Sequence, residues 1–235
     1  MTTKKNFLIF GLLIAMSGVL NAQNQYGTWT SAGLEKKAGN WNFGAETELR
    51  TIHYVRLINR WSLSMNAEYK IAKPLKVGIG YEFMNVLDEK YLNYQFRNRF
   101  NADISGKQKL GNFAFSLRER IQLTKKNDSK RIDEDGYNDT YKIDPAWVWR
   151  NKLNADYNIP KCRFTPGISV ETYYSLNDPD GNKLDKLRYI LYTDYKINKY
   201  NKIKIFGVLN SEKGTDEADY SGKYNLGLSF SHEIK

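Results

Sequence analysis

The chain has 235 residues, a formal charge of +10 at pH 7, a single cysteine and an aromatic content of 14%. One cysteine excludes an intramolecular disulfide framework. The basic residues are spread along the chain without the clustered patch that nucleic-acid binding needs, so nucleic acid is not an expected partner. The combination of many aromatic residues with 26% charged residues is typical of strands that have one lipid-facing side and one wet side.

The first residues have the pattern of a secretory signal peptide. Lys4 and Lys5 precede an apolar run over residues 7–20, and Ala22 supplies the small residue before a cleavage site. The run is short for a membrane-spanning helix, which disfavours the alternative of a retained anchor. We therefore expect residues 1–22 to be cleaved, which removes two lysines and lowers the charge from +10 to +8. Residues 23–235 contain no internal linker and are expected to form one domain.

The rest of the chain is a series of segments in which apolar and polar residues alternate. In chain order these segments are 26–35, 41–50, 61–71, 75–83, 92–104, 113–123, 147–157, 164–174, 187–197, 202–210 and 220–234. Alternation with period two is a property of β-strands, because successive side chains point to opposite faces. The clearest case is the pair 92–104 and 113–123, which we predict to be a hairpin with a turn at residues 106–111. Two polar residues, Asn98 and Glu119, fall on its apolar face, so we expect a bulge there or strand ends that extend beyond a membrane.

The connections between these segments alternate in length. Short turns lie near Gly39, Pro74, Gly106, Pro160 and Lys199, and longer polar loops cover residues 51–60, 85–91, 125–144, 176–186 and 211–219. Short turns on one side and long loops on the other are typical of an outer-membrane β-barrel, with the short turns in the periplasm and the long loops outside the cell. We predict an all-β, antiparallel, up-and-down transmembrane barrel. Eleven segments alternate, whereas bacterial barrels have even strand numbers. We therefore expect ten strands if 26–35 does not span, or twelve if one strand has been missed.

Periodicity alone does not say which face is outside. A soluble, lipocalin-like barrel would place its apolar stripe inside. The strands are long enough to cross a bilayer when tilted, and aromatic residues such as Trp41, Trp61 and Trp147 lie near strand ends, as in interfacial girdles. The number of strands also exceeds that of a lipocalin. These features favour an apolar outer surface in contact with lipid and a charged interior.

The last strand contains Asn225, Gly227, Phe230 and His232, and resembles the C-terminal signal that the barrel-assembly machinery recognises.

Several motifs elsewhere carry a family resemblance. They are Trp29 with Leu34, Trp41 followed by Glu46, Glu48, Leu49 and Arg50, Phe96-Arg97-Asn98-Arg99, Leu117-Arg118-Glu119-Arg120, and residues 147–153. Together they resemble an uncharacterised family of exported barrel proteins of Bacteroidetes-type, Gram-negative bacteria, catalogued as domain of unknown function 2490. The resemblance implies a barrel fold and an integral outer-membrane location, and it implies no catalytic residue.

The charged face of the strands supplies the candidate functional residues. The residues expected to line the lumen are Glu46, Glu48, Arg50, Glu68, Glu82, Arg97, Arg99, Arg118, Arg120, Arg150, Glu171 and Arg188. Arginine suits bidentate pairing with carboxylates, and we expect Arg97, Arg99, Arg118 and Arg120 to cluster on one lumen wall, opposite or beside Glu46, Glu48 and Glu68. The favoured interpretation is a structural or envelope-interaction barrel whose lumen is filled by its own ion pairs. The alternative is a narrow, anion-preferring, porin-like channel.

Other chemistry has weaker support. A lipid hydrolase or acyltransferase needs a nucleophile beside a base, yet His53 falls in a loop, and Ser231 and His232 point to opposite faces. We expect no catalytic residue, cofactor or metal. The acidic loop residues Asp133, Glu134, Asp135 and Asp139 could attract calcium, but their spacing fits no EF-hand and favours solvated charge. Basic residues near strand ends could contact lipopolysaccharide phosphates, so the expected partners are outer-membrane lipid, lipopolysaccharide and the assembly machinery.

Overall fold

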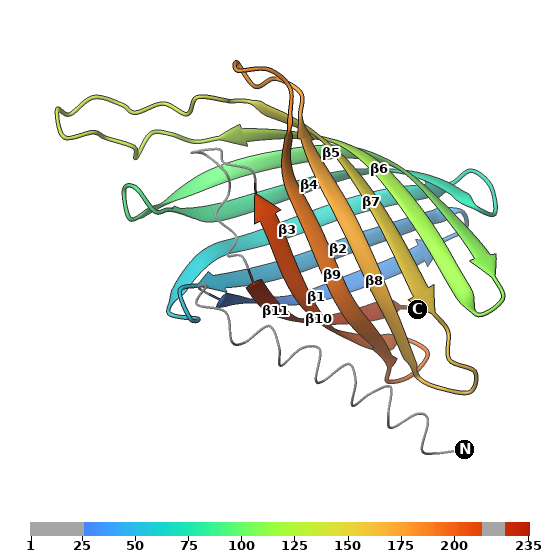
Figure 1. Ribbon diagram of the computed structural model, residues 1–235. Helices are drawn as coiled ribbons and strands as arrows, with labels where there is room; N and C mark the ends of the chain where they lie inside the picture. Colours follow the sequence, from blue (N-terminus) through green and yellow to red (C-terminus); the bar gives the residue numbers. More distant parts are fainter. Residues whose placement is uncertain (1–25, 213–223) are drawn as a thin grey trace.

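Eleven β-strands close into a barrel in the computed structural model (Figure 1). The structure describes residues 26–212 and 224–235, so the predicted signal peptide lies outside the described residues. The strands are β1 (Tyr26–Ala38), β2 (Trp41–Ile52), β3 (Leu57–Lys70), β4 (Leu75–Asp88), β5 (Asn93–Leu110), β6 (Phe113–Lys126), β7 (Ala146–Tyr157), β8 (Phe164–Ser175), β9 (Leu184–Lys196), β10 (Asn201–Glu212) and β11 (Tyr224–Ile234). Consecutive strands pair antiparallel throughout. The predicted all-β barrel is confirmed.

The barrel closes through a parallel pair. β1 lies beside β11 in a register that runs from Tyr26 opposite Tyr224 to Lys36 opposite Ile234. Strands alternate in direction around the wall, so an odd number of them must close with two parallel neighbours. The described residues contain eleven strands, between the ten and twelve expected. The suspicion that the first segment does not span was wrong, because β1 is paired along its length on both edges.

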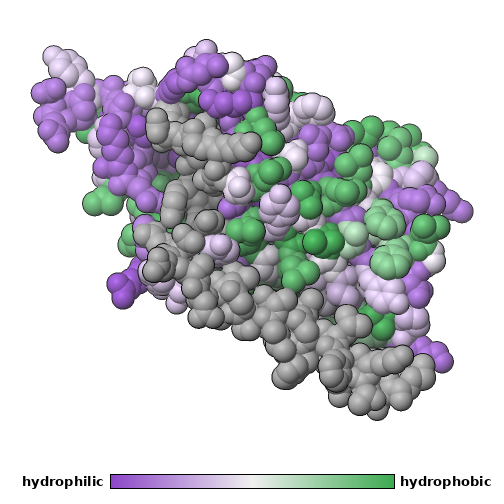
Figure 2. Space-filling model, in the orientation of Figure 1, coloured by the Kyte–Doolittle hydropathy of each residue, from purple (hydrophilic) through white to green (hydrophobic). Residues whose placement is uncertain are grey.

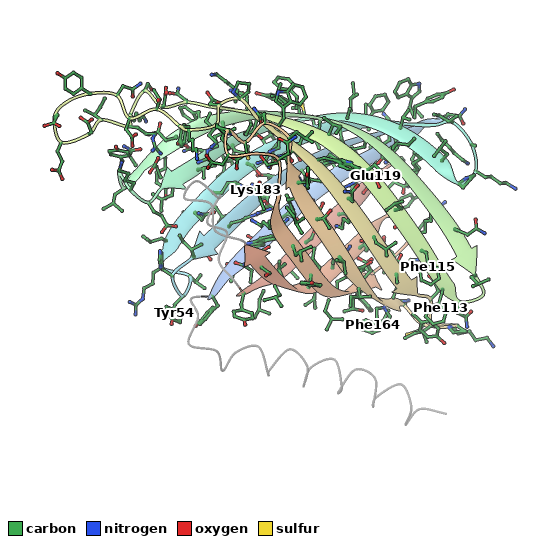
Figure 3. All side chains as sticks on the ribbon, turned by 45° about the horizontal axis from the view of Figure 1, so that its top comes forward. Tyr54, Phe113, Phe115, Glu119, Phe164 and Lys183 are labelled. Carbon is green, nitrogen blue, oxygen red and sulfur yellow. The ribbon has the colours of Figure 1, made fainter. Side chains whose placement is uncertain are left out.

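The outer surface of the wall is apolar. Hydrophobic residues spread over the barrel wall in Figure 2, whereas hydrophilic residues crowd the long loops. Within the described residues, no helix combines the length and the apolar character needed to cross a membrane. Aromatic pairs on the outer face follow the ends of the strands at the short turns: Trp41 with Tyr69, Phe113 with Tyr157, and Phe164 with Tyr195, with ring centroids 4.7–4.9 Å apart. Phe113, Phe115 and Phe164 can be followed at this end in Figure 3. Such a ring of aromatic residues is the girdle expected at a membrane interface.

Asn98 and Glu119, the two polar residues on the apolar face of the β5–β6 hairpin, point outward, and the strands have no bulge at either residue. The pairing of β5 with β6 is regular through both Asn98 and Glu119. The Tyr81 hydroxyl donates a hydrogen bond to Asn98 (2.6 Å), and the Trp149 indole N–H donates one to Glu119 (2.9 Å; Figure 3). The expected bulge was therefore wrong, because each polar group finds a hydrogen-bond donor on the outer surface instead.

The longest connection, residues 127–145, extends beyond the barrel mouth and is tied to the neighbouring strands (Figure 1). Arg131 of this loop is buried and forms ion pairs with Asp88 (2.5 Å) and Asp139 (3.0 Å). Asp139 also accepts hydrogen bonds from Lys90 (2.8 Å) and from the Tyr91 hydroxyl (2.7 Å). These contacts join the loop to the end of β4, so we call the five residues the loop clasp.

Candidate functional site

An internal cavity of about 870 Å³ runs between the two ends of the barrel. Its lining includes Glu35 and Lys76 beside the short turns, and Lys126, Ile143 and Asp178 beside the long loops. All twelve charged residues selected from the sequence line this cavity: Glu46, Glu48, Arg50, Glu68, Glu82, Arg97, Arg99, Arg118, Arg120, Arg150, Glu171 and Arg188. The alternation along each strand places them there, because inward and outward positions succeed one another without interruption in the middle of the strands. The lumen is thus a narrow and strongly charged space.

One group of these residues lies on β2 to β5 and is nearly balanced in charge. Both nitrogens of the Arg50 fork face Glu48, at 2.7 and 3.1 Å, and Arg60 reaches the same carboxylate at 2.5 Å. Arg99 pairs with Glu82 at 2.9 Å, and Arg60 approaches Glu82 at 3.5 Å. Three guanidinium groups thus share two carboxylates, and the carboxylate of Glu46 lies on the same strand as Glu48. We call Glu48, Arg50, Arg60, Glu82 and Arg99 the Glu48 group.

A second group forms a continuous row across four strands. Arg118 of β6 is the register neighbour of Lys152 of β7, Lys152 that of Glu171 of β8, and Glu171 that of Arg188 of β9. In the adjacent row, Arg150 is the neighbour of Tyr173. Three cations and one carboxylate therefore lie side by side on the inner wall. We call Arg118, Arg150, Lys152, Glu171 and Arg188 the Glu171 group.

The carboxylate of this group is almost completely surrounded. The side chain of Glu171 is 2% exposed, and its Oε1 accepts hydrogen bonds from Arg118 and Arg150, each at 2.8 Å. Its Oε2 accepts the Tyr173 hydroxyl at 2.9 Å and lies 3.7 Å from Arg188. A buried carboxylate with this many donors is held ionised by them. It neutralises one positive charge, whereas four positive charges surround it.

Aromatic rings lining the lumen fix the arginines in place. The guanidinium of Arg50 lies 3.6 Å from the ring centroid of Trp29, and that of Arg188 lies 4.8 Å from the same ring. Tyr173 lies under Arg150 (4.5 Å) and Arg188 (5.0 Å) in the same way. Cation–π contacts of this kind restrict the side chains without neutralising their charge.

Sequence reasoning missed the aromatic part of the lining and several lysines. Trp29 is only 4% exposed and faces inward, although the weak alternation of the first segment gave it no assigned face. Lys152, Lys186, Lys202 and Lys204 also line the cavity. Their position on the polar face of each strand was the signal that could have found them.

The four arginines lie on the neighbouring strands β5 and β6 and so share a wall, but the expectation that they cluster there was wrong. Arg97 and Arg99 face Lys126 and Thr124 across the β5–β6 pair, whereas Arg118 faces Ser105 and Arg120 faces Asp103. The hairpin turns at Gly111 and Asn112, later than the predicted turn at 106–111, so the two arginine pairs lie at different heights along the barrel. As a result Arg99 joins the Glu48 group, Arg118 joins the Glu171 group, and Arg120 pairs with Asp103 at 2.5 and 2.7 Å.

Positive charge exceeds negative charge along the cavity. Fourteen arginine and lysine residues contribute to its lining, against eight aspartate and glutamate residues. The inward-facing Asp103, Asp156 and Asp194 stand behind this lining and pair with cations. When these three acids and Lys107, the partner of Asp156, are added to the lining residues, the cations exceed the acids by four. The lumen therefore has a positive interior potential, which favours anions over cations.

The histidines do not form a catalytic pair with a nucleophile in the described contacts. His53 lies 3.5 Å from Glu89, and His232 lies 2.8 Å from Asn201. Among the described residues, no group of three or more histidine, cysteine or acidic side chains is arranged to hold a metal ion. In the acidic loop, Asp133 instead accepts backbone N–H bonds from Asp135 and Tyr137.

Comparisons with known proteins agree with the barrel architecture. The NanC porin structure is similar at a TM-score of 0.52 with 15% sequence identity, over 88% of this chain and 98% of that one. The KdgM porin, solved in complex with disordered oligogalacturonate, matches at a TM-score of 0.45 with 14% identity, over 80% and 91% of the two chains. No curated protein matches this chain.

The family assignment rests on the sequence. A family model described as "Protein of unknown function (DUF2490)" matches residues 26–221, which include the described strands β1 to β10. That match spans well over half of the 235 residues. The chain therefore belongs to the DUF2490 family of proteins of unknown function.

Proposed function

We propose that this protein is an outer-membrane β-barrel that forms a narrow channel with a preference for small anions. The observation that carries the proposal is the internal cavity of about 870 Å³, lined by residues from both ends of the barrel and by more cations than anions. A low-dielectric wall around fixed positive charge attracts anions and repels cations. The apolar outer surface and the aromatic girdle support a place in a membrane.

The cavity is small enough to restrict the solutes. Spread over a hydrocarbon thickness of ~30 Å, 870 Å³ corresponds to a mean cross-section of only about 30 Å². Most of the inward carboxylates are tied to arginines or lysines, so their side chains hold fixed positions around this path. Solutes of a few heavy atoms fit such a path, and folded macromolecules do not.

A second candidate function is the structural or envelope-interaction barrel. The observation that favours it is the number of ion pairs along the inner wall, because paired side chains that fill the lumen stabilise the wall and leave little room for conduction. In this case the exposed basic residues beyond the strand ends would contact lipopolysaccharide phosphates, and the protein would have no transport role. The signal peptide and the barrel-assembly machinery belong to both proposals as the route of export.

Reconstitution in planar bilayers separates the two candidates. We expect small conductance steps in KCl, and under a KCl gradient a reversal potential of the sign that shows chloride permeating faster than potassium. Substitution of Glu48 or Glu82 is unsuitable as a probe, because these carboxylates form ion pairs with arginines of the wall and their loss would destabilise the barrel. Lys202→Gln removes a lumen cation outside both groups and should shift the reversal potential toward that of a non-selective pore. The absence of channel events at any voltage would leave the structural barrel.

Location is tested independently of conductance. We expect the protein in the outer-membrane fraction, with faster gel migration before boiling than after it, because an intact barrel binds detergent without unfolding. Recovery as a soluble periplasmic monomer would overturn both candidate functions.

A further inference from the structure

The structure assigns to the Glu171 group a discrete binding site for an oxyanion, either a small dianion such as inorganic phosphate or the phosphate or carboxylate group of a larger solute. The donors are Arg118, Lys152 and Ser169. The site deepens the proposed function, since the anion reaches it through the lumen.

The first step of the argument is the local balance of charge. Arg118, Arg150, Lys152 and Arg188 surround one carboxylate, Glu171. In the Glu48 group, by contrast, Arg50, Arg60 and Arg99 share two carboxylates, Glu48 and Glu82. Lys76, Arg120 and Lys204 each have a carboxylate of their own. The excess of positive charge is therefore greater in the Glu171 group than in the Glu48 group, and charge withdrawn from water is costly without a counterion.

The second step is that the donors held by Glu171 do not include Lys152. Its two oxygens already receive Arg118, Arg150 and the Tyr173 hydroxyl. Lys152 is the register neighbour of Glu171. Within the described part of the chain, however, the Lys152 ammonium forms no hydrogen bond or ion pair. The lysine lines the cavity and is free to bind an anion from the lumen.

The third step is independent of charge. Ser169 lies two residues before Glu171 on the same inward face, is 1% exposed, and lines the cavity. Its hydroxyl has no hydrogen-bond partner among the described residues, and the Nε–H of Arg118 is also unsatisfied. Buried donors without partners are rare and commonly mark the place of an ion or water. Lys152 is the register neighbour of Arg118 and of Glu171, and Ser169 lies two residues before Glu171. The ammonium and guanidinium groups can only donate hydrogen bonds and the hydroxyl can donate one, so the chemistry favours an anion.

Arg150 and Arg188 are held in place by other residues of the protein and need no anion to position them. Arg150 is held by Gln122 (2.7 Å) and Tyr173 (3.1 Å), and Arg188 by Asn210 (2.9 Å) and by the ring of Trp29. Arg118 is the most exposed of the three arginines, at 27%, and binds Glu171 through one nitrogen only. We infer that Arg118 and Lys152 contact the anion directly, whereas Arg150 and Arg188 supply a preorganised positive field.

The test is thermal unfolding of the full chain in detergent, with sodium phosphate compared with sodium chloride at matched ionic strength. A ligand that binds only the folded state raises the unfolding temperature in a saturable way, so we expect a saturating rise with phosphate and a smaller, non-saturating one with chloride. Lys152→Gln should weaken the apparent phosphate affinity about tenfold or more, as loss of a charge-assisted hydrogen bond does. Without phosphate, the same variant should unfold at an equal or higher temperature than the parent, because it removes an uncompensated charge.

Lys76→Gln is the matched control, because it removes the same charge from the same lumen at a lysine that already pairs with Glu68 (2.9 Å). It should leave the phosphate response unchanged. An equal loss in both variants, or equal responses to phosphate and chloride, would overturn the site. If Lys152→Gln does not fold, Ser169→Ala replaces it with the same expectation.

The outcome is distinguishable from that of the proposed function. A saturable phosphate response in a protein that shows no conductance would sink the channel and leave the site. Conductance without a specific phosphate response would sink the site and leave the channel.

Discussion

Arg50 lies over the indole ring of Trp29, with its guanidinium carbon 3.6 Å from the ring centroid, although the two residues belong to different strands. The same ring contacts Arg188 of β9 at 4.8 Å. Trp29 thus joins the closing strand β1 to both sides of the lumen, and it connects the Glu48 group with the Glu171 group.

Replacing this ring should destabilise the barrel. Trp29→Ala removes a buried side chain that is 4% exposed, and deletion of a buried tryptophan costs about 3–5 kcal/mol. We expect a correspondingly lower unfolding midpoint in detergent, measured by circular dichroism. Trp29→Phe keeps a ring for both arginines and should recover at least half of the loss. Equal destabilisation by both variants would contradict a role for an aromatic ring at this position in holding the two arginines.

Glu171→Gln should be the most destabilising single substitution in the lumen. It leaves three arginines and Lys152 without their shared carboxylate, and loss of one partner of a buried ion pair costs about 3–5 kcal/mol. Glu46→Gln is the control, because Glu46 accepts only a long hydrogen bond from Ser31 (3.3 Å) among the contacts found. We expect the Glu46 variant to unfold close to the parent. Denaturant unfolding in the same detergent compares the two, and similar midpoints would contradict the assigned role of Glu171.

Glu119 is an acidic residue on the outer apolar face, between Leu117 and Ile121. A charge on the lipid face destabilises a barrel by up to about 2–4 kcal/mol, and less for an acid than for a base. Glu119→Leu loses the hydrogen bond from Trp149 (2.9 Å), worth about 1 kcal/mol. We therefore expect a net stabilisation of about 1 kcal/mol in lipid bilayers, measured by urea unfolding in vesicles. Glu119→Gln keeps an acceptor for Trp149 and should gain stability too, whereas a loss in both variants would indicate that the carboxylate is needed at this surface.

The loop clasp should open in acid. The hydrogen bond from Lys90 to Asp139, with that from Tyr91, holds the pKa of Asp139 below its usual range. A lowered pKa means that the stabilisation is complete above the unfolded value of about 3.9 and is lost as the pH falls through the lower folded value. A dye on Ser129→Cys, in a Cys162→Ser background, should therefore keep its anisotropy from pH 7 to pH 4 and lose it at lower pH.

Asp139→Asn should show the mobile loop already at pH 7. Glu134→Gln in the same loop is the charge-matched control, because Glu134 is exposed, and it should behave like the parent. A loop that is equally rigid in the Asp139 variant would show that the Arg131–Asp88 pair alone holds it.

Because β1 and β11 are parallel, both strands begin at the same end of the barrel. Tyr26 begins β1 beside the long loops, and Ile234 ends β11 beside the short turns. Single cysteines at these two positions, in a Cys162→Ser background, should therefore react with a membrane-impermeant maleimide from opposite sides. In intact cells we expect labelling at position 26 and labelling at position 234 only after the outer membrane is opened. Labelling of both from one side would contradict the parallel pair.

The sequence by itself determined most of the strands and the face to which most of their side chains point. In segments such as Arg118 to Gln122, alternation with period two separates the lumen from the outer surface residue by residue, because a strand has only two faces. That local rule was enough to place all twelve charged residues along the cavity. It was also enough to indicate a barrel, since each segment has an apolar face that needs lipid or a core.

The tertiary structure decided which of these residues meet. Periodicity predicts which face of the strand a side chain occupies, but not its position along the barrel axis. The position of Arg118 relative to Arg97 depends on where the hairpin turns. The turn at Gly111 and Asn112, with Gly111 at a positive φ of 58°, sets the register that sends Arg118 to Glu171 and leaves Arg99 with Glu82. The contact of Trp29 with Arg188 depends on ring closure between β1 and β11. Such contacts join residues far apart in the chain, and only the closed barrel brings them together.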